Sequence, residues 1–559
     1  MSHTAGRSSR SLARGAIALV VLGTILRLLK FFERPGLWVD EAMIAINIGR
    51  RSFGELLDPL DFNQLAPVPW LWLEKLLVSL GGMHELVLRA PALVAGIAVP
   101  WLVWRAGLHL VGEWGALVAT ALTATGSALI FFAAETKPYG TDAALAALLL
   151  LLAGRCLTRP IGDRALHVLG MVGLAAVLFS FPAVFTLGGI GIALIARAGM
   201  ARHVAAIRAT VAWGSAWLLA FVLPQLLIYR QTGRSDAMQH FWYPAMAHLG
   251  EPGLPDRISS AINATLLTLV GVEIWPGTEL FVAVLVLGAW AVVRKRGVVT
   301  MLVVTAPIGL LALAWVFDQI PANERLLLFV APILALLFGA AVAEIMHRIP
   351  YRVRQIGTLP IAMIIAWLMV DGATEGLHRP KASGGRELVV AVQQDPHAPV
   401  WVGRWGMPVW LYYSTDWNAP DTARIDWYAA QSRDGSTAGA AVIFDEGPGR
   451  ARRWHDRVER IAGQSGMKSV AGGRTNRGMV EAWAANEVRL IAAMADQRPW
   501  IVMIHENVQE HEAMRRSLDV AGIGVDSVVA QKRASLWRVL GPRDQEPSAA
   551  STSSTDPQR

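Results

Sequence analysis

Residues 113–135 read EWGALVATALTATGSALIFFAAE, and none of the 21 side chains between the two glutamates ionises at neutral pH. At a rise of about 1.5 Å per residue, a helix of this length spans roughly 30 Å, the thickness of the hydrocarbon core of a bilayer. Residues 209–229 and 297–317 are equally long and equally free of charge. The chain is therefore predicted to cross a membrane several times.

The composition of the 559-residue chain agrees with this prediction. Hydrophobic residues make up 54% of the chain and charged residues 17%, whereas a soluble domain carries about 25% charged residues. A purely soluble protein is therefore excluded. The net charge of +8 is expected from basic cytoplasmic loops. No basic module with interleaved aromatic residues indicates a nucleic-acid partner. Cys156 is the only cysteine, so no intramolecular disulfide can form.

Apolar segments predict about eleven transmembrane helices. No small-residue cleavage site follows the first apolar run before Arg27 and Lys30, so this run is predicted to be a retained span rather than a signal peptide. The expected spans are residues 15–32, 86–104, 114–134, 138–154, 165–180, 182–196, 209–229, 274–293, 297–317, 326–346 and 355–371.

Loop charges predict the orientation of these spans. Lys and Arg are concentrated in the tail 1–14 and in every second loop, which places those segments in the cytoplasm. Both flanks of residues 165–196 are rich in Arg, so the number of spans between them must be even, and Pro182 is the expected turn. Eleven spans from a cytoplasmic N-terminus leave the C-terminus outside. The expected location is a bacterial cytoplasmic (inner) membrane.

The long apolar runs end after Asp371. Residues 372–385 are predicted to form a linker, 386–541 a small extracytoplasmic α/β domain, and 542–559 a disordered tail. The expected fold is a polytopic α-helical membrane domain, residues 15–371, followed by this C-terminal α/β domain. The expected strands are 399–403, 409–413, 440–444, 500–505 and 536–540, with helices near 449–463, 479–496 and 506–521.

Ionisable residues gather at the outer ends of the expected spans, where charge beside hydrocarbon is costly and usually functional. Asp40 and Glu41 follow the first span, Arg89 opens the second, residues 135–139 join the third and fourth, and Arg325 opens the tenth. Each position also has a structural explanation, because Arg and Lys at helix ends extend toward the interface. Together they predict an active site at the membrane surface, where acids activate a hydroxyl and cations bind a phosphate.

The first outer loop, residues 33–85, is predicted to contain helices that lie in the interface. Residues 38–52 carry apolar side chains at helical spacing, and the tryptophan-rich segment 70–73 follows two prolines. The alternative is an amphipathic connector. In a later outer loop, His240 and Trp242 are candidates for ring contacts with a sugar, and an aromatic belt at the interface is the alternative.

A metal site is a further alternative. Asp40, Glu41, His84 and His240 are the side chains that could assemble one, but no ligand spacing requires it. No metal and no cofactor are therefore predicted.

Four motifs occur in a fixed order along the first part of the chain. They are Leu37-Trp-Val-Asp-Glu-Ala42, Asn63-Gln-Leu-Ala-Pro67, Glu85-Leu-Val-Leu-Arg89-Ala-Pro91 and Glu135-Thr-Lys-Pro-Tyr139. Their order resembles the bacterial branch of the GT-C glycosyltransferases, akin to the protein mannosyltransferases and the aminoarabinose transferase of lipid A. The resemblance covers residues 15–160 well and the later spans loosely, and it hardly extends to the C-terminal domain. It implies an integral-membrane transferase that takes a sugar from a polyprenyl-phosphate carrier on the outer face.

The resemblance also implies roles for individual residues. Asp40 matches the catalytic acidic position of the family, which is proposed to deprotonate the acceptor hydroxyl, and Glu41 is its neighbour. Arg89, Lys137 and Arg325 are the candidates for the carrier phosphate. Lys137 stands where the family usually has arginine, so the charge is kept but the bidentate fork is lost.

The same motif contributes Glu135 and Tyr139 as candidates for substrate binding. The sequence departs from the family in the first outer loop, where Leu65-Ala66-Pro67 replaces His-Pro-Pro. Any metal or acceptor role tied to that histidine is therefore not expected here.

The residue types suit this chemistry. A lipid phosphate leaves readily once cations offset its growing charge, so no nucleotide and no Gly-rich phosphate loop are needed. A carboxylate on the opposite face of the sugar can act as general base in a single displacement, which inverts the anomeric centre. The expected partners are the polyprenyl-phosphate-linked sugar, membrane lipid, and an envelope glycan, lipid or protein as acceptor.

Two other functions remain open. A transporter or flippase for a lipid-linked sugar should place charges near the bilayer midplane or in broken helices, and often has repeated halves. The charge-free spans and the lack of a visible repeat favour the enzyme. A non-catalytic scaffold for envelope assembly predicts instead that Asp40 can be replaced without consequence.

Overall fold

A computed structural model describes residues 2–33, 35–162, 164–229, 241–269, 278–350, 358–379, 385–393, 398, 400–403, 406–415, 417, 441–443, 477–492, 495–504, 508–531 and 534–542. Contacts divide the chain into two compact units. The helical unit comprises residues 1–34 and 47–380, and the α/β unit comprises residues 35–46 and 381–559. Part of the first outer loop therefore packs with the C-terminal segment.

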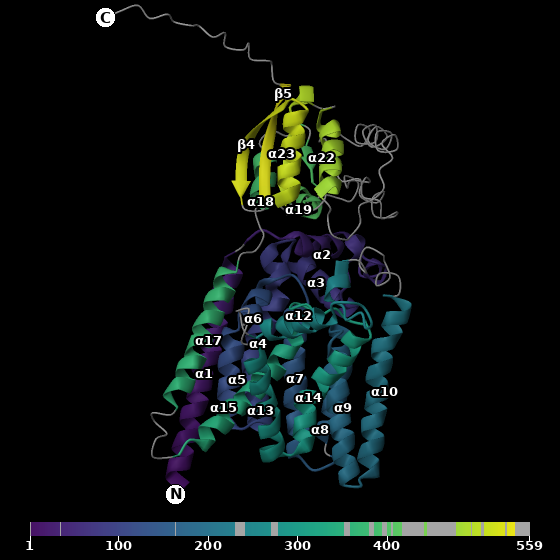
Figure 1. Ribbon diagram of the computed structural model, residues 1–559. Coiled ribbons are helices and arrows are strands. Elements are labelled where there is room, and N and C mark those ends of the chain that lie inside the picture. The colour runs from purple at the N-terminus through teal and green to yellow at the C-terminus, as the bar shows by residue number, and fades with distance from the viewer. Residues whose placement is uncertain are drawn as a thin grey trace, which may run out of the picture. The chain divides into compact units, whose positions relative to one another are not determined.

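The helical unit is built from long apolar helices that run alongside one another, with α1 in contact with α17 (Figure 1). The long helices are α1 (Ser2–Phe32), α4 (Glu85–Leu110), α5 (Glu113–Thr125), α7 (Tyr139–Thr158), α8 (Arg164–Phe179), α9 (Ala183–Met200), α10 (Val204–Leu227), α13 (Thr278–Arg296), α14 (Val298–Val316), α15 (Ala331–Arg348) and α17 (Leu359–His378). The shorter α12 covers Leu254–Leu267. Their buried apolar side chains form one continuous core.

Among the described residues, eight helices are long and apolar enough to cross a membrane, and a bent pair adds a ninth span. The protein is therefore a multi-pass membrane protein, as predicted. The 16-residue α8 and the 19-residue α13 occupy the remaining two expected positions. Pro182 lies between α8 and α9, which confirms the expected turn.

The bent pair is the third expected span. Helix α5 ends at Thr125, and α6 (Ser127–Phe131) with the 3-10 turn η3 (Phe132–Ala134) continues at an angle of 54°. The fully buried Arg27 of α1 donates to the carbonyl oxygens of Thr123 and Ala124 at 2.8 and 2.9 Å. A cation at the end of a helix satisfies carbonyls that have no partner within the helix, so Arg27 stabilises the break.

Helix α17 extends beyond Asp371 to His378, into the segment that was expected to be a linker. Gly372 and Gly376 face the break between α5 and α6. A Cβ atom at Gly372 would stand 2.7 Å from the Thr125 carbonyl oxygen, and one at Gly376 would stand 3.1 Å from the Ser127 Cα. Small residues allow such close approach of helices in membranes. Here glycine marks helix packing rather than a flexible connection.

The first outer loop contains two helices. Helix α2 covers Val39–Arg50 and α3 covers Val68–Gly81, and the short 3-10 turns η1 (Glu55–Leu57) and η2 (Asp61–Asn63) lie between them. Pro67 and Pro69 stand at the start of α3, where the fixed φ of proline is tolerated. Two helices are thus present where the sequence predicts them.

The α/β unit contains a five-stranded sheet with the order β2-β1-β3-β5-β4. Strand β1 pairs parallel with β3, and the other pairs are antiparallel. Helices α22 and α23 pack against each other and share a core with the sheet (Figure 1). The strands are β1 (Val400–Val402), β2 (Ala441–Ile443), β3 (Trp500–Ile504), β4 (Ile523–Gln531) and β5 (Ala534–Pro542), and the helices are α18 (Gly385–Gln393), α19 (Met407–Ser414), α22 (Arg477–Ala492) and α23 (Val508–Val520).

One prediction within this domain is wrong, and one strand was not predicted. Residues 409–413 form α19 rather than a strand, because Pro408 starts a helix and outweighs the strand preference of the aromatic residues that follow. Strand β4 was not expected, since Gly524 and Asp526 are rare in strands, yet it pairs along β5. The predicted helix at 449–463 lies outside the described residues, as does the predicted tail 542–559 except for Pro542, which ends β5.

Candidate functional site

Asp40 and Glu41 lie in the first turn of α2, on the part of the loop that packs with the α/β unit. Asp40 is half-buried and Glu41 is fully buried. The Trp38 backbone N–H donates to Glu41 Oε2 at 3.4 Å, as in a capping box. The positive end of the helix dipole favours negative charge at both residues. Glu41 therefore shapes the start of the helix that carries Asp40.

The motif Glu135–Tyr139 lies between η3 and α7 and is buried throughout. The exposed fractions of Glu135 and Lys137 are 1% and 5%. The Lys137 Nζ donates to Gln64 Oε1 at 2.6 Å, and the rings of Tyr139 and Phe132 meet edge to face at 5.5 Å. A charged side chain held this deeply has a defined position.

Arg89 lies near the start of α4 and is 1% exposed. Helices α4 and α7 are in close contact just beyond Arg89. A Cβ atom at Gly140 of α7 would stand only 3.2 Å from the Ala92 carbonyl oxygen of α4. Arg89 is one turn before Ala92, and Lys137 is three residues before Gly140. The structure therefore places both predicted cations at neighbouring ends of two packed helices.

Gln64 was not predicted as a site residue, although it belongs to a quoted motif. A tight turn directs it, since Phe62 and Asn63 both have positive φ, at 61° and 52°. The turn is held by Asn47, whose Oδ1 accepts the Asp61 N–H at 2.8 Å, and by an ion pair of 3.2 Å between Arg51 and Asp61. The end of α2 thus fixes the loop that presents Gln64 to Lys137.

The predicted residues Arg325 and Trp242 lie together in the helical unit. The Arg325 guanidinium is 5.1 Å from the centre of a Trp242 ring, a cation–π distance. Arg325 is half-buried and so is Trp242. His240, the other aromatic candidate, lies outside the described residues.

A further cation near the motif was missed. Arg379 follows α17 and forms a bidentate pair with Glu324 at 2.8 and 2.9 Å, and its guanidinium lies 4.5 Å from the Phe131 ring centre. It is close enough to Glu135 for a charge interaction. Its place just after the last span, on the expected outer side, was the signal that could have identified it.

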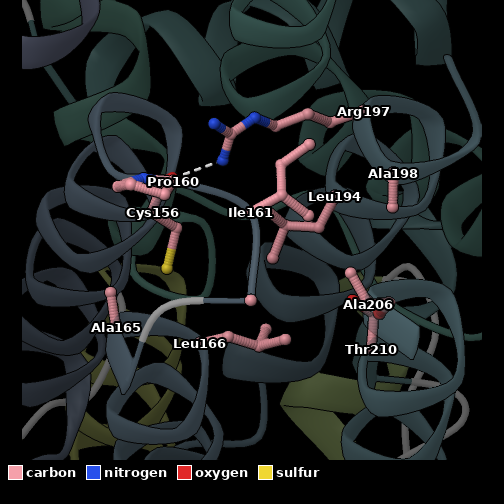
Figure 2. Close-up of a pocket in the computed structure, with 11 residues that line it drawn as sticks. Cys156, Pro160, Ile161, Ala165, Leu166, Leu194, Arg197, Ala198, Ala206 and Thr210 are labelled. Atoms are coloured by element: carbon pink, nitrogen blue, oxygen red, sulfur yellow. Dashed lines mark hydrogen bonds between the residues drawn. The ribbon is translucent and has the colours of Figure 1, made fainter. Parts of the chain in front are cut away.

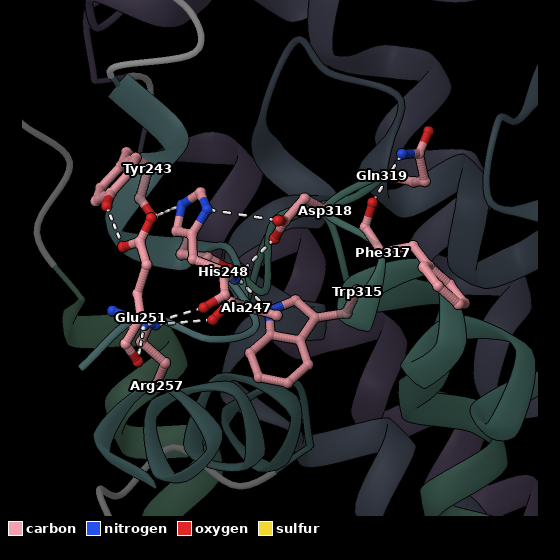
Figure 3. A network of polar contacts seen from close by, with 10 residues as sticks. Tyr243, Ala247, His248, Glu251, Arg257, Trp315, Phe317, Asp318 and Gln319 are labelled. Carbon is pink, nitrogen blue, oxygen red and sulfur yellow. Dashed lines mark hydrogen bonds and ion pairs between the residues drawn. The ribbon is translucent and has the colours of Figure 1, made fainter. Parts of the chain in front are cut away.

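A polar network holds the loop that carries Trp242. Figure 3 shows His248 stacked on Tyr243, with ring centres 4.0 Å apart, and directed at Asp318. The Asp318 carboxylate accepts the His248 backbone N–H at 2.9 Å and pairs with His248 Nδ1 at 3.4 Å. The Tyr243 hydroxyl donates to Glu251, which raises the pKa of Tyr243. The segment after Trp242 is thereby tied to the end of α14.

Two of the small cavities lie in the described part of the helical unit. One is lined by Gln64 and by Tyr229, whose hydroxyl accepts the Val68 N–H at 2.9 Å. The other lies at the C-terminal ends of α7 and α9, where Arg197 donates to the Cys156 carbonyl oxygen (Figure 2). None of the predicted site residues lines the second cavity. Within the described parts of the chain, no group of three or more His, Cys, Asp or Glu side chains is arranged to hold a metal ion.

No protein-family model matches this sequence, and no curated protein matches it either. Among solved structures, the chain is similar to ArnT from Cupriavidus metallidurans bound to undecaprenyl phosphate, with 14% identity, a TM-score of 0.52, and coverage of 93% of this chain and 97% of ArnT. The apo state of the same ArnT gives 14% identity, a TM-score of 0.50, and coverage of 94% and 98%.

A third likeness is to the Archaeoglobus fulgidus oligosaccharyltransferase in complex with Zn and sulfate, at 12% identity and a TM-score of 0.45, covering 68% of this chain and 55% of that one. The likeness to ArnT extends over almost the whole of both chains, including the α/β unit that the sequence motifs hardly reach. The fold expected from the resemblance is therefore confirmed: this chain has the fold of ArnT.

Proposed function

We propose that this protein is a membrane glycosyltransferase that moves a sugar from a polyprenyl-phosphate donor to an envelope acceptor on the outer face of the membrane. The observation that supports it most is the pair of buried cations, Arg89 and Lys137, at neighbouring ends of α4 and α7. This pair occurs in a fold whose ArnT example binds undecaprenyl phosphate. Two cations held at neighbouring helix ends can bind a phosphate group and offset its negative charge.

Each residue has a proposed chemical role. Arg89 and Lys137, with Arg325, bind the carrier phosphate and offset the charge that grows on it as the sugar leaves. Asp40 removes the proton from the acceptor hydroxyl, and Glu41 maintains the helix start around it. Glu135 and Tyr139, with His240 and Trp242, contact the substrate. A single displacement of this kind inverts the anomeric centre, and it needs neither metal nor cofactor.

The location follows from the same proposal. The protein lies in a bacterial inner membrane with its N-terminus in the cytoplasm and the α/β unit outside, where lipid-linked donors meet envelope acceptors. The acceptor is an envelope glycan, lipid or protein.

The proposal is tested by sugar transfer in nanodiscs. Undecaprenyl phosphate carrying radiolabelled mannose or aminoarabinose is the donor, cell-envelope extract is the acceptor, and a chelator is present throughout. We expect wild-type turnover and a loss of about 10²-fold or more in Asp40→Asn, which is nearly isosteric but cannot act as a base. Equal turnover of the two folded proteins would contradict a catalytic role for Asp40.

A transporter is the second candidate, because the third span is broken by 54° beside a buried arginine, and transporters use broken helices. The alternatives differ in the product. Movement of the labelled donor across a proteoliposome membrane, without any change in the donor itself, would favour the transporter. A labelled acceptor and released undecaprenyl phosphate would favour the enzyme.

A further inference from the structure

The α/β unit contacts the loop segment just before Asp40. The Leu37 backbone N–H donates to the Tyr413 hydroxyl at 2.7 Å, across 376 residues of sequence. Both residues belong to the α/β unit. The approach is close, since a Cβ atom at Gly36 would stand 3.2 Å from the Tyr413 hydroxyl oxygen. Only glycine fits at residue 36 without movement of its neighbours.

Tyr413 is itself held firmly. It lies on α19, its ring meets Tyr412 edge to face at 4.9 Å, and the Arg386 guanidinium of α18 stands 5.7 Å from its ring centre. Helix α19 packs on α18, and a Cβ atom at Gly406, just before α19, would stand 3.0 Å from Ile504 of β3. The sheet thus determines where the hydroxyl lies.

The Tyr413 hydroxyl contributes to the start of α2. Backbone N–H groups at a helix start have no partner within the helix. The Trp38 N–H is satisfied by Glu41 at 3.4 Å, the Leu37 N–H by Tyr413, and the Ala42 N–H bonds to the Trp38 carbonyl oxygen at 2.9 Å. Leu37 is also buried, with an exposed fraction of 1%. The backbone on both sides of Asp40 is therefore held in place, and with it the Cα atom from which the Asp40 side chain extends.

We infer that Tyr413 is a positioning residue for Asp40, and that the α/β unit acts on sugar transfer through this contact. The inference rests on the proposed function, in which Asp40 is the general base. It assigns a task to the α/β unit, which sets the geometry of the base. A displacement of about 1 Å at a reacting group can cost on the order of 10²-fold in rate.

The test is Tyr413→Phe, which keeps the ring and its contacts with Arg386 and Tyr412 and removes only the hydroxyl. In the nanodisc assay with undecaprenyl-phosphate mannose or aminoarabinose, we expect kcat to fall about three- to tenfold, the range for loss of one hydrogen bond. The KM for the donor should not change. The matched control is Tyr412→Phe, the neighbouring tyrosine of α19, which should keep wild-type kcat.

A double-mutant cycle separates positioning from a general structural effect. If Tyr413 acts through Asp40, the variant with Tyr413→Phe and Asp40→Asn should be no slower than Asp40→Asn alone. If the kcat losses of the two single variants multiply in the double variant, the inference is overturned. A Tyr413→Phe variant with wild-type kcat would overturn it as well.

Hydrogen exchange of the purified protein tests the contact without any donor. Amides in residues 35–46 should exchange faster in Tyr413→Phe than in wild type and Tyr412→Phe, with peptides from α22 unchanged. Unchanged exchange in residues 35–46 would overturn the inference. If neither donor supports turnover in wild type, but residues 35–46 exchange faster in Tyr413→Phe, the result contradicts the proposed function and not the contact between Tyr413 and Leu37.

Discussion

At the scale of single residues, Lys137 is the cation whose surroundings the structure defines best. Its ammonium group is buried and bonded to Gln64 at 2.6 Å. An ammonium carries three N–H donors, and an amide oxygen accepts one of them. Gln64 therefore orients Lys137 without neutralising its charge, which a carboxylate at the same position would do. Gln64 thus limits the orientations of an ammonium group that lacks the fixed fork of an arginine.

Replacement of Lys137 should weaken donor binding. We expect Lys137→Met to raise the donor KM by about 10- to 100-fold, the range for loss of a hydrogen bond to a charged group, and Gln64→Met by about threefold. Lys75→Met is the control, since Lys75 also bonds to the first outer loop, at the Gly49 carbonyl oxygen, but has no role in the proposed chemistry. The measurement is donor KM in nanodiscs. A Lys137→Met variant with wild-type KM and wild-type kcat would remove Lys137 from the phosphate site.

At the scale of elements, α3 is a helix with two apolar faces. Trp70, Leu71 and Val78 are buried on one face, whereas Trp72 and Leu80 are exposed on the other. An exposed apolar face on a helix of the first outer loop suits the membrane interface. The buried face also carries Glu74, which is fully buried, and neither of its carboxylate oxygens has a hydrogen-bond partner among the described residues. Burial raises the pKa of Glu74 well above its ordinary value.

The raised pKa of Glu74 predicts a stability that depends on pH. Between the ordinary pKa of a glutamate and the raised pKa in the folded protein, the folded state binds more protons than the unfolded state. The free energy of unfolding should therefore decrease as pH rises through this window. Thermal melting at pH 5 and pH 8 should show a smaller decrease for Glu74→Gln, which cannot titrate, than for wild type. Equal decreases in the two proteins would show that Glu74 is ionised at both pH values.

At the scale of the whole molecule, the positively charged loops also have structural partners. Glu344, buried at the end of α15, pairs with Lys295 and Arg348 at 2.8 and 2.9 Å and with Arg294 at 3.2 Å. These basic residues belong to the loops expected in the cytoplasm. Arg294 and Lys295 join α13 to α15 through Glu344, as well as indicating the orientation of the helices.

The predicted orientation can be measured by cysteine labelling. With Cys156→Ser as background, single cysteines are introduced at Leu249, in an outer loop, and at Ala201, between α9 and α10; both positions are exposed. A membrane-impermeant maleimide should label Leu249→Cys when the inner membrane is intact and Ala201→Cys only after permeabilisation. The opposite pattern would contradict the positive-inside assignment and place the α/β unit in the cytoplasm.

The sequence by itself determined the features that depend on neighbouring residues. In hydrocarbon, the backbone N–H and C=O groups of a single segment find hydrogen-bond partners only within a helix. The long uncharged runs 114–134, 209–229 and 297–317 could therefore be predicted directly as helical spans. The turn at Pro182 and both helices of the first outer loop follow from local patterns in the same way. The motif order likewise predicted the fold that ArnT shares.

Only the tertiary structure decided which distant residues meet. The contacts of Leu37 with Tyr413 and of Gln64 with Lys137 join residues 376 and 73 positions apart. No periodicity in a single sequence encodes such pairs, because each depends on how whole elements pack. Two local predictions failed for the same reason: Gly372 lies within α17 and allows its close packing against the end of α5 rather than opening a linker, and residues 409–413 form α19 after Pro408 rather than a strand. The surrounding fold determines the effect of these residues.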